Sequence, residues 1–97
     1  MERGGCVYII TNAINNVYYI GVTSDLYARV FEHKNKIYLN SFTAKYNCNK
    51  LVWFEMLPTI TEAIGREKQL KKWNRQWKIN LIEKTNPDWI NLFNEEL

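Results

Sequence analysis

The first third of the chain holds a group of side chains that could act on a phosphate ester: Tyr8, Tyr19, Arg29 and His33. A guanidinium binds phosphate oxygens through paired N–H donors. Phenol and imidazole groups can orient a water molecule or move a proton. The alternative is that each residue has an ordinary structural role, since a strand tyrosine commonly belongs to the core and a single histidine commonly lies on a surface.

The spacing of these residues predicts that they meet. Side chains alternate between the two faces of a strand, so Tyr19 and Gly21 share a face. If the hairpin places Tyr8 opposite Tyr19 or Gly21, both phenols project from that face, and Gly21 leaves space beside them. Arg29 and His33 are four residues apart, which places them on one surface of a helix.

Glu67 lies in the middle of an apolar helical stripe formed by Ala63, Ile64 and Leu70. A carboxylate on the inward side of a helix is costly unless it is paired or binds a cation. One interpretation is an ion pair with Lys71, one turn further along the helix. The other is a site for a hard cation, Mg²⁺ or Mn²⁺, because Mg²⁺ needs only one or two protein carboxylates.

The elements that must position these side chains form an α+β fold. The pattern predicts a small three-stranded antiparallel sheet flanked by helices, in the order β-β-α-β-α-α with a short C-terminal helix. Strands are predicted at 6–11, 17–22 and 51–57; helices are predicted from about 25 to 36, from about 61 and through 73–81. Residues 36–49 have no clear period and are predicted to form an exposed basic loop.

Capping residues mark two of the helix starts. Thr23 or Ser24 can cap the first helix, with Asp25 in its first turn. Asn86 followed by Pro87 predicts the N-cap and first position of the short final helix, which contains Trp89.

Positive charge is concentrated in residues 66–84, which carry a net charge of +5, whereas the other 78 residues sum to −2. Such a segment on a near-neutral body favours a phosphate-binding face, although a solvated helical face gives the same composition. The candidate nucleic-acid contacts are Lys34, Lys36, Lys45, Lys68, Lys71, Lys72, Arg75 and Lys78.

Length and composition predict one domain, residues 1–97. Two cysteines and one histidine give no disulfide framework and no closed zinc set. The N-terminal "MERGG" lacks a leader pattern, and no apolar run has the length of a membrane span. We therefore expect a cytoplasmic protein without a membrane partner.

Several separate motifs together resemble the GIY-YIG nuclease superfamily. They are Tyr8, "YIG" at 19–21, Arg29, His33 and Glu67, together with "IGVTSDLYARVFEHK", "REKQLKKW" and "NPDW". In particular, the chain resembles the small single-domain subfamily related to the N-terminal nuclease domain of the excision-repair endonuclease UvrC. The resemblance covers nearly the whole chain and implies the same sheet flanked by helices.

The resemblance implies a role for each residue. Tyr8 and Tyr19 are the two motif tyrosines, one of which acts as general base or orients the attacking water, and Arg29 or the metal makes that phenol more acidic. Arg29 also clamps the scissile phosphate, and His33 relays or accepts a proton. Glu67 is the single protein ligand of Mg²⁺ or Mn²⁺. Gly21 belongs to the structural motif.

The chain departs from the family pattern at several positions. Cys6 stands where many members have glycine, and the loop after Val22 lacks the lysine of the repair enzymes. The later-helix asparagine of the family is unassigned, with Asn74 and Asn80 as candidates.

The expected function is a divalent-metal-dependent endonuclease that hydrolyses phosphodiester bonds in DNA, or alternatively in RNA or in repair and recombination structures. Substrate preference then comes from nucleic-acid shape, a protein partner or a homodimer. The alternative function is a non-catalytic nucleic-acid-binding module or an adaptor in a DNA-repair complex.

Overall fold

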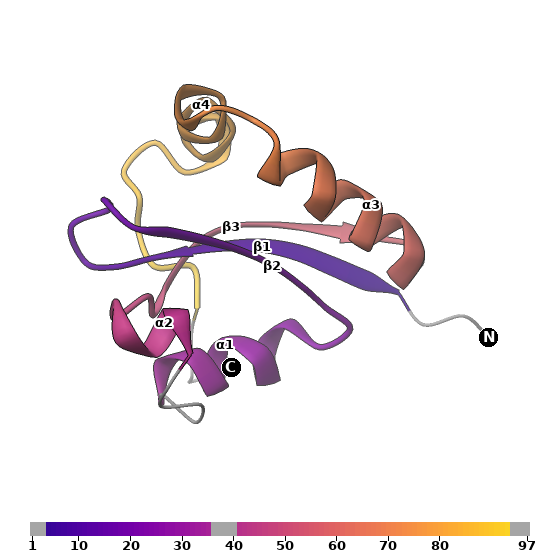
Figure 1. Ribbon diagram of the computed structural model, residues 1–97, viewed down its shortest axis with the longest axis horizontal. Coiled ribbons are helices and arrows are strands. Elements are labelled where there is room, and N and C mark those ends of the chain that lie inside the picture. Colours follow the sequence, from indigo (N-terminus) through magenta and orange to yellow (C-terminus); the bar gives the residue numbers. More distant parts are fainter. Residues whose placement is uncertain (1–3, 36–40, 94–97) are drawn as a thin grey trace.

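A computed structural model of the chain describes residues 4–35 and 41–93 (Figure 1). It confirms the predicted α+β class, with a three-stranded antiparallel sheet and the order β-β-α-α-β-α-α. The elements are β1 (Gly5–Thr11), β2 (Tyr18–Thr23), α1 (Leu26–Lys34), α2 (Phe42–Lys45), β3 (Lys50–Leu57), α3 (Ile60–Lys71) and α4 (Arg75–Thr85). Within the described ranges, no helix is long and apolar enough to span a membrane.

The central strand of the sheet is β1, and the strand order is β2-β1-β3. All of its residues are buried, because it is paired on both sides and covered on both faces. It runs antiparallel to β2, with Tyr8 opposite Gly21. This register is one of the two that the sequence left open, and it places Tyr8 and Tyr19 on one face.

Helices cover both faces of the sheet, α3 and α4 on one side and α1 and α2 on the other (Figure 1). Val7 and Ile9 pack with residues of α3 and α4, whereas Tyr8 packs with Val30 of α1. The helix that carries Glu67 therefore lies across the sheet from the Tyr8 side chain. Because β2 is an edge strand, residues from the two faces can meet around its outer edge.

The start of α1 differs from the capping prediction. Asp25 is the N-cap, and its Oδ1 accepts a hydrogen bond from the Ala28 N–H at 3.1 Å. The Thr23 hydroxyl oxygen accepts from the Asp25 N–H at 3.0 Å, which fixes the turn before the helix. The prediction of Thr23 or Ser24 as the cap was therefore wrong, since the Asp25 carboxylate is the group that accepts from a free N–H of the first helical turn.

The segment predicted as a basic loop contains α2. The Cys48 N–H donates to the Thr43 carbonyl at 2.8 Å, and this bond closes the turn after the helix. A helix of four residues is too short to give a hydrophobic period, which explains the wrong prediction. Lys36 and its neighbours up to residue 40 lie outside the described residues.

The predicted final helix is absent between residues 86 and 93 of the described chain. Asn86 is instead the C-cap of α4, and its side chain is buried. Its amide donates to the Val52 carbonyl at 3.0 Å, and its Oδ1 accepts from the Ile90 N–H at 3.0 Å. Asn86 thus connects the last segment to β3. Its buried amide must have hydrogen-bond partners, and because Val52 and Ile90 supply them, the side chain does not cap a following helix.

Candidate active site

Tyr8 fills the space left by the missing side chain of Gly21. The Tyr8 residue is 0% exposed, and a Cβ added at Gly21 would collide with its phenol oxygen and ring carbons. Gly21 has no positive φ, so this glycine is required for space and not for backbone conformation. The face beside Gly21 is therefore filled by Tyr8, which corrects the expectation that it is open.

The buried Tyr8 oxygen has two polar partners. It lies 2.9 Å from His33 Nε2, and it is hydrogen-bonded to the Arg29 guanidinium. Burial raises the pKa of the Tyr8 phenol to about 12, and the hydrogen bond from Arg29 opposes this rise only in part. Arg29 therefore lowers the pKa of this phenol, as expected, but the net shift is upward, because desolvation of the phenolate outweighs the nearby positive charge.

His33 joins the sheet to α2. Its Nδ1 lies 2.8 Å from Thr43 Oγ1, and its ring centroid lies 5.5 Å from that of Tyr19. Burial lowers the pKa of His33 to about 4, and the positive charge of Arg29 acts in the same direction. The imidazole is therefore neutral near pH 7. Sequence reasoning missed Thr43, because nothing in its local sequence indicates which distant side chain it meets.

Arg29 lies between the two motif tyrosines. Hydrogen bonding to Tyr8 is the first cause that raises the pKa of its guanidinium, and Tyr19 contributes a smaller bond. Glu32 Oε2 lies 3.6 Å from Arg29 Nη1, one helical turn away. The structure thus brings together four of the five predicted catalytic residues, namely Tyr8, Tyr19, Arg29 and His33.

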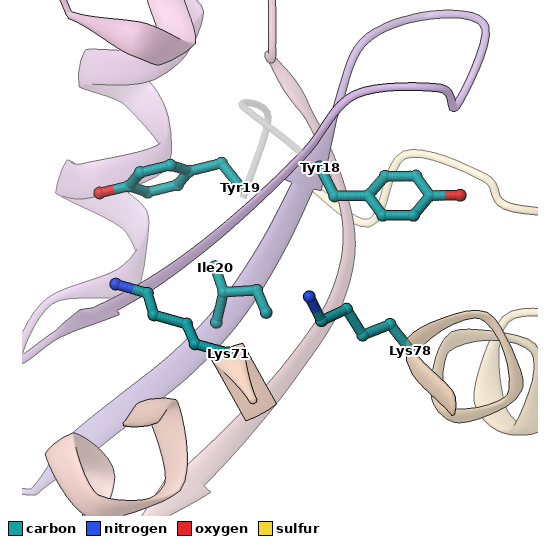
Figure 2. Close-up of a pocket in the computed structure, with 5 residues that line it drawn as sticks. All are labelled: Tyr18, Tyr19, Ile20, Lys71 and Lys78. Carbon is teal, nitrogen blue, oxygen red and sulfur yellow. The ribbon is translucent and has the colours of Figure 1, made fainter. Parts of the chain in front are cut away.

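A depression of about 270 Å³ lies along β2, lined by Tyr18, Tyr19, Ile20, Lys71 and Lys78. Figure 2 shows Tyr19 and Lys71 on one side of Ile20, with Tyr18 and Lys78 on the other. Tyr19 is half-buried, whereas Tyr8 is fully covered. Of the two motif phenols, Tyr19 is the one accessible from this depression.

Comparison with known proteins identifies the fold family. A family model described as the GIY-YIG catalytic domain matches residues 4–80. The chain belongs to the GIY-YIG family. It is also similar to a UPF0213 protein of Syntrophus aciditrophicus (strain SB), with 34% identity over 82 residues, covering 84% of this chain and 92% of that protein. No solved structure matches the chain significantly.

GIY-YIG catalytic domains are typically phosphodiesterase nucleases and generally use a divalent metal. Within residues 4–35 and 41–93, no group of three or more His, Cys, Asp or Glu side chains could hold a metal ion. A metal in this part of the chain would therefore have at most two such protein ligands, with water and substrate oxygens as the others. This requirement suits Mg²⁺, which retains several waters when it binds proteins.

Glu67 of this GIY-YIG domain fits that requirement. Its side chain is only 15% exposed, and its Oε1 lies 3.3 Å from Nζ of Lys71, whose side chain is 53% exposed. The ion pair that the sequence offered as one interpretation is therefore present. The ion pair with an exposed ammonium is weak, so Glu67 is the carboxylate that would hold a metal cation in place of Lys71. Lys71 also lines the depression beside Tyr19, which places Glu67 next to the edge of β2.

The predicted basic contacts separate into distinct environments. Lys71 and Lys78 line the depression. Arg75 instead stacks on the Tyr18 ring, with its guanidinium carbon 4.7 Å from the ring centroid, and donates to the Asn16 carbonyl at 3.4 Å. Arg75 therefore holds the start of α4 against the hairpin. Exposed lysines elsewhere are Lys34, Lys45, Lys68 and Lys72.

The later-helix asparagine of the family has no counterpart in the depression. Asn80 accepts a hydrogen bond from the Gln76 amide at 2.9 Å and lines a separate hollow with Trp73 and Trp77. Asn74 is the N-cap of α4. Both candidates thus have other positions in this chain.

Proposed function

We propose that this chain is a divalent-metal-dependent endonuclease that hydrolyses phosphodiester bonds in DNA. The observation that carries the proposal is the placement of Arg29, which is hydrogen-bonded to two tyrosines beside a lysine-lined depression. Membership of a family of catalytic domains supports the same conclusion. The resemblance to the UvrC nuclease domain favours a substrate of DNA repair.

The two tyrosines have different roles in this proposal. Tyr19 contacts the attacking water, since it is the phenol that the depression exposes. Arg29 binds an oxygen of the scissile phosphate and offsets the charge that develops in the transition state. Tyr8 stays protonated at neutral pH and holds Arg29 and His33 in place. The catalytic set remains Tyr8, Tyr19, Arg29, His33 and Glu67.

Glu67 would hold the metal, which when bound stabilises charge on the leaving oxygen. With the cation bound, the Lys71 ammonium would no longer be paired with the Glu67 carboxylate. Once released, Lys71 is free to contact a neighbouring phosphate in the same depression. Lys78 lies on the other side of Ile20, and in this proposal its ammonium contacts a second phosphate.

The proposal is tested by incubating the protein with duplex, single-stranded and branched DNA, and with RNA of matched sequence, in Mg²⁺, Mn²⁺ or EDTA. We expect cleavage of DNA in either metal and none in EDTA. The variant Glu67→Gln keeps the side-chain shape and should abolish cleavage, while Mn²⁺ binding measured by calorimetry should be lost in parallel. Glu83→Gln is the matched control, because Glu83 is an exposed carboxylate on α4.

Two results would count against the proposal. Full cleavage by Glu67→Gln in Mg²⁺ would remove the metal role of this residue. Salt-sensitive DNA binding without cleavage under any metal condition would favour the alternative, a non-catalytic nucleic-acid-binding module.

A further inference from the structure

A line of hydrogen-bonded side chains leads from the candidate active site to α2. Tyr8 Oη lies 2.9 Å from His33 Nε2, and His33 Nδ1 lies 2.8 Å from Thr43 Oγ1. Thr43 Oγ1 is in turn 3.2 Å from Ser41 Oγ. Tyr8, His33 and Thr43 are each at most 8% exposed, so water cannot readily replace a missing partner.

The direction of these hydrogen bonds follows from the groups at one end. A guanidinium has only donors, so Arg29 must donate to the Tyr8 oxygen. The phenol proton of Tyr8 then needs an acceptor, and among its contacts in the described residues only His33 Nε2 can accept. If Nε2 carried a proton, the Tyr8 oxygen would face two donors, and neither of its hydrogen-bond partners in the described residues could accept its own proton.

The protonation of His33 is thereby fixed. Its pKa of about 4 makes the imidazole neutral near pH 7, and an unprotonated Nε2 leaves the single ring proton on Nδ1. Nδ1–H points at the Thr43 oxygen, and the Thr43 hydroxyl can donate onward to Ser41 Oγ. The polar hydrogens of Tyr8, His33 and Thr43 then each have an acceptor.

We propose that Thr43 is a positioning residue: its hydroxyl accepts the Nδ1 proton of His33 and thereby holds Nε2 as the acceptor of the Tyr8 proton. The lone pairs of the Tyr8 oxygen then remain available to Arg29. Thr43 acts on the reaction only through His33, Tyr8 and Arg29, and this part of the inference rests on the proposed nuclease function.

The tautomer can be measured without substrate or metal. His33 is the only histidine in the sequence, so long-range ¹H–¹⁵N correlations of the imidazole in ¹⁵N-labelled protein have one source. We expect the Nδ1–H tautomer in the wild-type protein and in Thr43→Ser, which retains a hydroxyl. Thr43→Val has nearly the same shape but no acceptor, and should show a mixture containing the Nε2–H form.

Cleavage kinetics provide the second readout. Thr43→Val should lower kcat on the order of 10-fold with little change in KM, as expected for an outer hydrogen bond that orients a histidine, and Thr43→Ser should restore it. An Nε2–H tautomer in the wild-type protein overturns the proposal, and this measurement needs no variant to fold. An unchanged tautomer in folded Thr43→Val overturns it as well. The expected tautomers in a protein that cuts no DNA support the role of Thr43 in setting the tautomer and overturn the nuclease function instead.

Discussion

At the scale of single residues, burial decides the chemistry of the candidate active site. Tyr8 and His33 face each other at 2.9 Å, yet their pKa values move in opposite directions, to about 12 and about 4. Both shifts have the same first cause, which is that burial disfavours the charged form of each group. Near neutral pH the pair is therefore uncharged, and Arg29 is the charged group that both of them adjoin.

The depressed pKa of His33 predicts a loss of stability in acid. Between pH 6.5 and 4 the unfolded chain binds a proton at His33 that the folded chain does not, so the free energy of unfolding falls as pH falls across this window. The contribution is of order 3 kcal/mol and is fully present above pH 6.5. His33→Gln should lack this part of the pH dependence.

The measurement is urea denaturation of the two proteins from pH 7 to pH 4. The difference in unfolding free energy between them isolates the histidine from carboxylates that titrate in the same range. If the unfolding free energies of the wild-type protein and His33→Gln change in parallel from pH 7 to pH 4, the pKa of His33 is the same in the folded and unfolded states.

At the scale of elements, two glycines have opposite functions. Gly21 in β2 makes room for the Tyr8 ring, whereas a Cβ at Gly65 in α3 would meet nothing within 4 Å. Neither has a positive φ, so neither backbone requires glycine. The strand position is constrained by packing alone, and the helix position is not constrained at all.

Alanine substitutions should therefore change stability in opposite directions. Gly65→Ala is expected to raise the free energy of unfolding by up to about 1 kcal/mol, because glycine is a poor helix former. Gly21→Ala should lower it by about 1–3 kcal/mol through overpacking against the rigid Tyr8 ring, and should also disturb the contact with His33. Chemical denaturation checks both values, and a neutral Gly21→Ala would mean that the Tyr8 ring can move aside.

At the scale of the whole molecule, the outer edge of β2 is where side chains from the two faces of the sheet line one depression. Tyr19 reaches it from the face covered by α1, and Lys71 reaches it from α3 (Figure 2). Arg75 closes the far end by stacking on Tyr18. The basic residues of segment 66–84 therefore lie in different environments. Of these residues, we expect Lys71 and Lys78 to contact phosphate.

Salt dependence of DNA binding tests this division. In EDTA, where cleavage is not expected, the double variant Lys71→Ser/Lys78→Ser should flatten the slope of log K against log salt by roughly two units, about one per lost phosphate contact. Lys84→Ser removes one positive charge at the other end of α4 and is the control, with little expected change in slope. Equal slopes for the wild-type protein and the double variant would place the DNA elsewhere on the surface.

The sequence by itself determined the features that depend on local spacing. Alternation along the strands placed Tyr19 with Gly21, and helical spacing placed Arg29 with His33; the structure has both pairs arranged in this way. The combination of motifs also indicated the family, which the match over residues 4–80 confirms. These inferences succeeded because each depends on neighbours a few residues away or on a pattern of several motifs.

Tertiary structure decided what lies against each side chain. Only the packed fold shows that Tyr8 fills the Gly21 space, that Asn86 is a buried tether and that Thr43 reaches His33. Burial raises the pKa of Tyr8 above its ordinary value, where the sequence had led us to expect a lowered pKa. This desolvation depends on every element that covers the phenol. No local period records such contacts, since their partners come from distant segments that meet only when the sheet and its two helical layers close around them.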